Sequence, residues 1–103
     1  MSLREKQSEF MWALGLLIIY AYSLGYELTG GDLWAVRGHK ENSKHYSRLA
    51  IDLNLFYEGE YLTETEAHRP LGEYWEQLGG IWGGRFTNPD GNHYEWPTEE
   101  DSG

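Results

Sequence analysis

Cysteine is missing from the 103-residue chain, and its absence excludes several kinds of site. A disulfide scaffold, a zinc site made of thiolates and a thiol nucleophile all require it. Any metal site would have to be built from histidine and carboxylate side chains.

Basic residues are also few. Lysine and arginine total 8, whereas aspartate and glutamate total 17, which gives a net charge of −9. Such a chain gains nothing from counterion release on nucleic acid, and anionic membranes repel it. We therefore expect neither nucleic acid nor a membrane surface as a partner.

An apolar run long enough to cross a membrane is missing as well. The longest apolar stretch, from Phe10 to Tyr22, is shorter than the ~20 residues that a spanning helix needs. The charges before it are mixed, with Arg4 beside Glu5, whereas a secretory leader has a basic flank and a small-residue cleavage site. The stretch predicts a buried helix rather than a leader or a stable membrane anchor.

Aromatic residues are plentiful. They make up 16% of the chain, which is too many for a disordered polymer. The length supports one domain with one modest core. We expect a single domain over residues 1–96 and a disordered acidic tail over residues 97–103.

The N-terminal segment has the pattern of a capped helix. Ser2 and Glu5 have the spacing of a capping box, and Gly25 is placed to end the helix. Apolar residues occupy most of its sides, so we expect a central helix that is covered on most faces. The apolar residues on one side are Phe10, Leu14, Leu17, Ile18 and Ala21, and those on the other are Trp12, Leu16 and Ile19.

The rest of the chain alternates short strands with one more helix. Residues 48–56 alternate apolar and polar side chains, which places Asp52 opposite the apolar face of a strand. A second capping-box pattern begins at Thr63, and Pro70 is placed to start a helix that runs to Leu78. The other expected strands are residues 26–29, 61–62, 81–86 and 92–96, and residues 32–44 are expected to form a surface loop. These elements predict an α+β fold, in which a small antiparallel sheet packs against the buried N-terminal helix and a short second helix.

Histidines and acids make up the candidate site. His45 precedes the strand that carries Asp52, and His93 begins the last strand, close in sequence to Asp90 and Glu95. Two histidines and one carboxylate are three zinc ligands that leave a fourth position for water. Zinc lowers the pKa of that water toward ~7, and a further carboxylate, Asp90 or Glu95, is then placed to take its proton.

Each of these residues also has a purely structural explanation. Asp90 belongs to an Asn-Pro-Asp-Gly turn, where aspartate bonds the local backbone. His93 is equally explained as a half-buried imidazole that bonds a neighbouring carboxylate. His39 and His68 are expected on the surface or in loops. Local spacing leaves these alternatives open.

Two segments together resemble the VanY-like zinc peptidases. Residues 43–52 (SKHYSRLAID) resemble the S-x-H-x-x-G-x-A-x-D signature of that family, with Arg48 in place of the glycine. Residues 75–95 resemble its closing segment, in which a Trp- and Gly-rich strand leads into D/E-x-x-H, here Asp90 to His93. The resemblance implies that Glu95 supports a ligand from outside the metal's own shell. The implied Zn²⁺ ligands are His45, Asp52 and His93, and the implied catalytic residues are Asp90 as general base and Arg37 or Arg48 for the oxyanion.

The resemblance also implies a substrate and a setting. We expect a monomeric zinc peptidase that cleaves peptidoglycan stem peptides in phage lysis and stays in the host cytoplasm until its release to the cell wall. An L-alanyl-D-glutamate endopeptidase is favoured, because the chain is short and has no anchor. The alternatives are a D-alanyl-D-alanine carboxypeptidase, a non-catalytic relative that binds metal or cell-wall peptide, and a structural phage component without metal.

Overall fold

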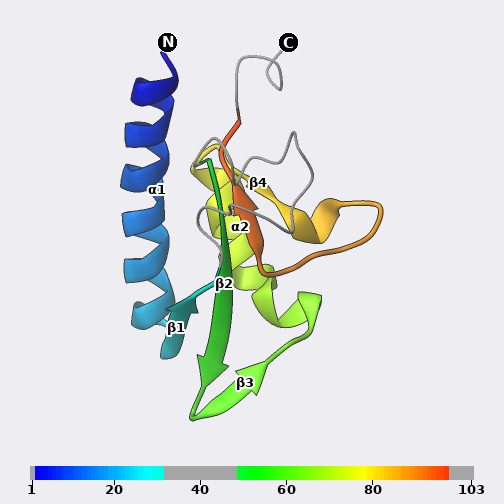
Figure 1. Cartoon of the computed structure of the whole chain (residues 1–103). Coiled ribbons are helices and arrows are strands. Elements are labelled where there is room, and N and C mark those ends of the chain that lie inside the picture. The colour runs from blue at the N-terminus through cyan, green and yellow to red at the C-terminus, as the bar shows by residue number, and fades with distance from the viewer. Residues whose placement is uncertain (1, 32–48, 98–103) are drawn as a thin grey trace.

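A computed structural model describes residues 2–31 and 49–97 of the chain. The expected surface loop over residues 32–44 and all of the expected tail except Pro97 lie outside the described residues. The elements are α1 (Leu3–Ser23), β1 (Tyr26–Gly30), β2 (Ala50–Tyr57), β3 (Glu60–Leu62), the 3₁₀ helix η1 (Thr65–His68), α2 (Arg69–Gln77), β4 (Ile81–Trp82), the 3₁₀ helix η2 (Gly83–Arg85) and β5 (His93–Glu95) (Figure 1). The predicted α+β class is confirmed.

Helix α1 begins and ends where the sequence predicts. The Ser2 hydroxyl accepts a hydrogen bond from the Glu5 amide at 3.1 Å, and the Glu5 carboxylate accepts one from the Ser2 amide at 3.1 Å. This is the complete capping box. After the last turn, Gly25 has a φ of 91°, a left-handed conformation in which glycine carries no Cβ penalty.

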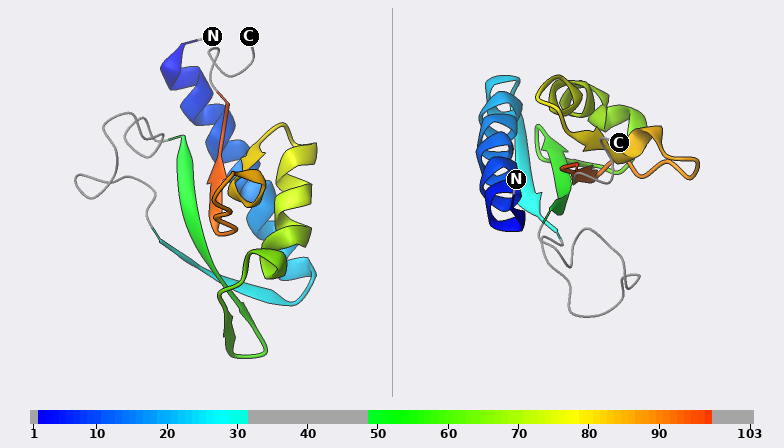
Figure 2. Two further views of the ribbon diagram at one scale, coloured as in Figure 1. Left: turned by 90° about the vertical axis from the view of Figure 1, so that its right-hand side faces the viewer. Right: turned by 90° about the horizontal axis from the view of Figure 1, so that it is seen from above.

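Within residues 2–31 and 49–97, only one face of α1 is covered. The buried residues of the helix are Phe10, Ala13, Leu14, Leu17 and Ala21, whereas Met11, Trp12, Ile18, Ile19 and Tyr22 are exposed. The expectation that α1 is covered on most faces is therefore wrong for the described part of the chain. Helix α1 lies along one side of the molecule, and none of the described elements packs on its outer side (Figures 1 and 2). Among the described residues, no helix has the length and apolar character to cross a membrane.

The sheet is antiparallel and built around β2. Its order is β1-β2-β5-β4, and β3 pairs with β2 outside that path. Strand β1 pairs with the C-terminal part of β2 along one edge. Strands β3 and β5 follow one another along the other edge, where β5 pairs with residues 50–52 and β3 with residues 55–57. Both ends of β2 are thus held on the edge that carries His93.

The alternation predicted for β2 is confirmed. Ile51, Leu53 and Leu55 are buried, while Asp52 and Asn54 are only half-buried on the opposite face. Both helices pack into one hydrophobic cluster with the buried face, and the Phe10 ring meets Trp75 edge-on at 5.9 Å. The core therefore lies on one side of the sheet, and Asp52 is left on the other.

Around α2 the prediction is right for the helix and wrong for its neighbours. Helix α2 spans Arg69–Gln77, within one residue of the expected range at either end. The strand expected over residues 81–86 stops at Trp82, because Gly83 and Gly84 turn into η2. The second capping box does not form either, since no side chain caps η1.

His68 is buried rather than on the surface. It is 2% exposed, and its Nδ1 lies 2.8 Å from the Tyr94 hydroxyl. Burial lowers the pKa of His68 to about 4, because the charged imidazolium would lose its hydration. At neutral pH this histidine is therefore an uncharged part of the core.

Candidate metal centre

Antiparallel pairing brings Asp52 and His93 together. Asp52 on β2 and His93 on β5 are register partners, so their side chains point to the same face of the sheet. Asp52 Oδ1 lies 3.3 Å from His93 Nδ1. Residues far apart in sequence are thus placed side by side by the sheet alone, on the face that does not carry the helices.

The other ring nitrogen of His93 is held by Glu95. His93 Nε2 lies 2.8 Å from Glu95 Oε1, and both residues are half-buried. They are two positions apart on β5, so they share a face of the strand. A carboxylate that accepts the Nε2 proton fixes the tautomer in which Nδ1 is left to bind something else.

The charges around His93 favour a cation. Burial lowers the pKa of His93, but its hydrogen bonds with Asp52 and Glu95 and their negative charge outweigh that effect and raise the pKa to about 9. In the protein without metal, the ring is therefore protonated at neutral pH, and its positive charge offsets part of the negative charge of the two acids. A metal ion at Nδ1 would take the place of that proton, as metal ligation by histidine requires.

Asp90 reaches the same place from the loop before β5. The His93 amide donates to the Asp90 carbonyl at 3.1 Å, so residues 90–93 form a turn that carries Asp90 back over the strand end. The ligand atoms of Asp52, Asp90 and His93 all lie within 4.8 Å of one another. Asp90 is exposed, whereas Asp52 and His93 are half-buried. Asp90 is thus the acid of this group with the most access to solvent.

The separation between Asp52 and His93 fits a zinc ion. Two ligand atoms that each lie about 2.0–2.1 Å from a tetrahedral zinc ion are about 3.3–3.4 Å apart. Asp52 Oδ1 and His93 Nδ1 are 3.3 Å apart. The pair therefore has the spacing of one edge of a zinc tetrahedron, and the acidic surroundings suit a divalent cation.

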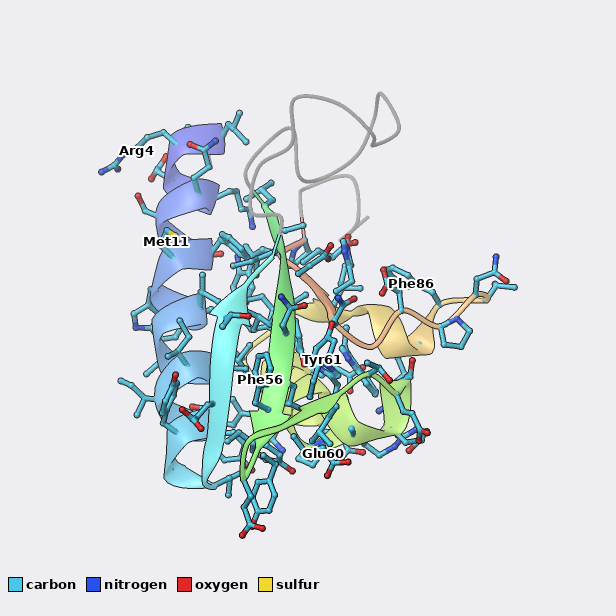
Figure 3. The ribbon with its side chains drawn as sticks, turned by 60° about the horizontal axis from the view of Figure 1, so that its bottom comes forward. Arg4, Met11, Phe56, Glu60, Tyr61 and Phe86 are labelled. Carbon is cyan, nitrogen blue, oxygen red and sulfur yellow. The ribbon has the colours of Figure 1, made fainter. Side chains whose placement is uncertain are left out.

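A polar pocket adjoins Asp90. It has a volume of about 170 Å³ and lies between β2, β3, η1 and the loop before β5. Asn54 and Tyr61 line it from the sheet, and the Tyr61 hydroxyl lies 3.4 Å from Asn54 Oδ1. Tyr61 also stacks on Phe56 at 5.1 Å, and Figure 3 shows these two aromatic side chains close together. The pocket therefore places a small polar cavity next to Asp90.

The structure brings together part of the predicted site. Asp52, Asp90 and His93 meet, with Glu95 behind His93 as expected. The other predicted residues, namely His45, Arg37 and Arg48, lie outside the described residues.

One contact at the site was missed from the sequence. The Thr65 hydroxyl accepts a hydrogen bond from the Gly91 amide at 3.2 Å, next to Asp90. Thr65 lies within the capping-box pattern that begins at Thr63 but has no capping role in that pattern, and only tertiary packing reveals this contact.

Comparison with known proteins shows which family the sequence matches. The sequence model of a family described as D-alanyl-D-alanine carboxypeptidase matches residues 37–96. The match includes all of the predicted ligands and catalytic residues, both inside and outside the described part of the chain. No curated protein matches the sequence.

Proposed function

The chain belongs to the D-alanyl-D-alanine carboxypeptidase family, whose VanY-like members are metal-dependent peptidases of peptidoglycan, and from this membership we propose that it is a zinc peptidase of peptidoglycan stem peptides. One observation carries the proposal. Asp52 and His93 face each other at 3.3 Å on the face of the sheet opposite the two α-helices, with Asp90 within reach of both.

The residues proposed to hold the zinc ion are His45, Asp52 and His93. Two histidines and a carboxylate are a set that leaves a position open for water. Glu95 would keep the Nδ1 of His93 directed at the ion by accepting the Nε2 proton. When bound, zinc supplies a water of lowered pKa and polarises the scissile carbonyl.

Asp90 has the proton-transfer role in this proposal. Its carboxylate is exposed and adjoins the polar pocket, so a water molecule and a substrate amide can both reach it. Asp90 takes a proton from the attacking water and passes it to the leaving amine, which departs neutral. Arg37 or Arg48 stabilises the negative charge that develops on the carbonyl oxygen.

The bond that we propose is the one between L-alanine and D-glutamate, and the setting is phage lysis. The protein would remain in the host cytoplasm as a monomer until it is released to the cell wall. The support for this choice is the resemblance of residues 43–52 and 75–95 to the VanY-like zinc peptidases, a family that includes lysis endopeptidases as well as carboxypeptidases. A second candidate is removal of the terminal D-alanine, which the description of the matching family favours.

Digestion of purified peptidoglycan tests the activity. Zinc-loaded wild-type protein is expected to release new amino termini on D-glutamate. The Asp90→Asn variant is expected to release them about 10²–10⁴-fold more slowly. Glu60→Gln, an exposed acid on β3, is the matched control and should keep it. Free D-alanine as the product would favour the carboxypeptidase. Tight zinc binding without either product would contradict the enzyme and support a non-catalytic relative.

A further inference from the structure

The turn that carries Asp90 is bonded to its surroundings through the backbone. The Asp90 amide donates to the Gly83 carbonyl at 2.9 Å, and the Leu53 amide donates to the Asn92 carbonyl at 2.8 Å. The turn is also closed internally by the bond from the His93 amide to Asp90. These contacts fix where the turn begins and ends, on η2 and on β2.

Two side chains hold the middle of the same turn. The Gly91 amide donates to the Thr65 hydroxyl at 3.2 Å. The Gly91 carbonyl accepts from the buried indole nitrogen of Trp82 at 2.8 Å. Both peptide groups that flank Gly91 are therefore fixed by side chains from other elements, η1 and β4.

Close packing accompanies the Thr65 bond. A Cβ added at Gly91 would lie 2.5 Å from the Cα of Thr65, which is closer than a Cβ atom approaches a non-bonded atom in proteins. Gly91 is buried, and Thr65 is half-buried against it. The η1 backbone and the turn are thus in direct contact, and the Thr65 hydroxyl lies where the contact is closest.

The Asp90 carboxylate depends on this backbone for its direction. Among the described residues, no hydrogen bond or ion pair holds that carboxylate, and Asp90 is exposed. The amide bonded by Thr65 belongs to the peptide group that joins Asp90 to Gly91. Rotation of that peptide group would change the ψ angle of Asp90 and with it the position of the carboxylate relative to Asp52 and His93.

We propose that Thr65 is a positioning residue for Asp90. Its hydroxyl fixes the peptide group after Asp90 and so aims the carboxylate at the space next to Asp52 and His93. Thr65 acts through the backbone, without contact to the reacting atoms. The catalytic consequence rests on the proposed peptidase function, whereas the effect on the turn does not. Misplacing a catalytic group by about 1 Å can cost ~10²-fold in rate, so loss of this bond is expected to be visible in kcat.

Thr65→Val and Thr65→Ser separate positioning from packing. Valine keeps the shape of threonine and loses the acceptor, whereas serine keeps the acceptor and loses a methyl group. Thr87→Val, at an exposed threonine of the loop before the turn, makes the same change away from the bond. Two readouts are needed: kcat and KM on peptidoglycan peptides, and hydrogen exchange of the Gly91 amide by NMR in the metal-free protein. Thr65→Ala serves in place of Thr65→Val if valine prevents folding.

In Thr65→Val we expect Gly91 exchange to speed up at least ~10-fold and kcat to fall ~10–100-fold, with KM changed less than ~2-fold. Thr65→Ser and Thr87→Val should stay close to wild type in both readouts. The proposal is overturned if Thr65→Val keeps wild-type kcat, if Thr65→Ser loses as much as Thr65→Val, or if Gly91 exchange is unchanged in Thr65→Val. An inactive wild-type protein would instead refute the proposed function, and the exchange measurement would then decide the role of Thr65 alone.

Discussion

Glu95 shows how a residue outside the ligand set can control the candidate site. It lies 2.8 Å from His93 Nε2, while the opposite ring nitrogen faces Asp52. The carboxylate sets the tautomer of the ring and raises the basicity of Nδ1. The strength of metal binding should therefore depend on a side chain that never touches the metal.

Glu95→Gln tests this dependence. Glutamine can still accept the Nε2 proton, but it has no negative charge, so zinc affinity should fall about 10–100-fold without loss of fold. Calorimetric titration of the metal-free protein with zinc measures it. Glu27→Gln, at an exposed acid on β1, is the control and should bind as wild type does. Equal affinities for the wild type and Glu95→Gln would show that Glu95 has no part in metal binding.

Substitution by alanine is expected to have opposite effects on the free energy of unfolding at two glycines, Gly91 and Gly15. A Cβ at Gly91 would meet the Thr65 backbone at 2.5 Å, whereas nothing lies within 4 Å of a Cβ at Gly15 in α1. Gly91→Ala should lower the free energy of unfolding by about 1–3 kcal/mol through overpacking. Gly15→Ala should raise it by about 1 kcal/mol through helix propensity. Urea unfolding measures both, and a neutral Gly91→Ala would contradict the close packing of η1 on the turn.

At the scale of elements, α1 is held to the protein by one face. Leu17 is fully buried on that face, and Ile19 is 68% exposed on the other. Leu17→Ala should therefore lower the free energy of unfolding by about 2–5 kcal/mol. Ile19→Ala should change it by less than about 0.5 kcal/mol, as surface substitutions usually do. Thermal and urea unfolding measure the difference, and comparable losses in both variants would mean that the outer face of α1 is covered in solution.

Elements governed by local rules could be predicted, and those governed by tertiary contacts could not. The Ser2 capping box and the alternation around Asp52 depend only on neighbouring residues, and both are confirmed. Thr63 to Glu66 has the same local pattern as the first box, but there Thr65 bonds Gly91 and Glu66 pairs with Arg69. Exposure of Trp12 could not be foreseen either, because a sequence shows that a helix is apolar on all sides without showing what covers each side.

The histidines and acids likewise divide into those that the sequence could predict and those that it could not. Sequence signatures single out Asp52, Asp90 and His93. The sheet register explains why Asp52 meets His93, and the turn at residues 90–93 explains why Asp90 joins them. His68 has no signature and was expected in a loop, yet it is buried against Tyr94. Burial of a polar side chain depends on a partner supplied by a distant strand, and spacing within the sequence does not reveal that partner.

At the scale of the whole molecule, His68 should make stability depend on pH. Its pKa is about 4 in the folded protein and 6.5 as the ordinary value, because burial disfavours the charged form. The unfolded chain therefore takes up the proton first as pH falls. The stabilising contribution is complete above pH 6.5 and is lost progressively as the pH falls to about 4, by roughly 3 kcal/mol in total.

Comparison with His68→Gln isolates this effect. Glutamine does not titrate, so the free energy of unfolding of the variant should fall less steeply between pH 6.5 and 4 than that of the wild type. Urea unfolding of the metal-free proteins at several pH values measures both slopes. Other acids contribute equally to the two proteins and cancel in the difference. Parallel curves would show that His68 is already protonated, or already hydrated, in the folded state.

The central claim is that one metal ion is bound jointly by His45, by Asp52 on β2 and by His93 on β5. Zinc titration of the metal-free protein tests this claim most directly. We predict that the wild type binds one zinc ion per chain, and that His45→Gln and His93→Gln each lose at least ~100-fold in affinity. His39→Gln, which alters a histidine outside the proposed ligand set, should bind as the wild type does. A wild-type protein that binds no zinc, or a His93→Gln variant that binds it as tightly as the wild type, would contradict the account.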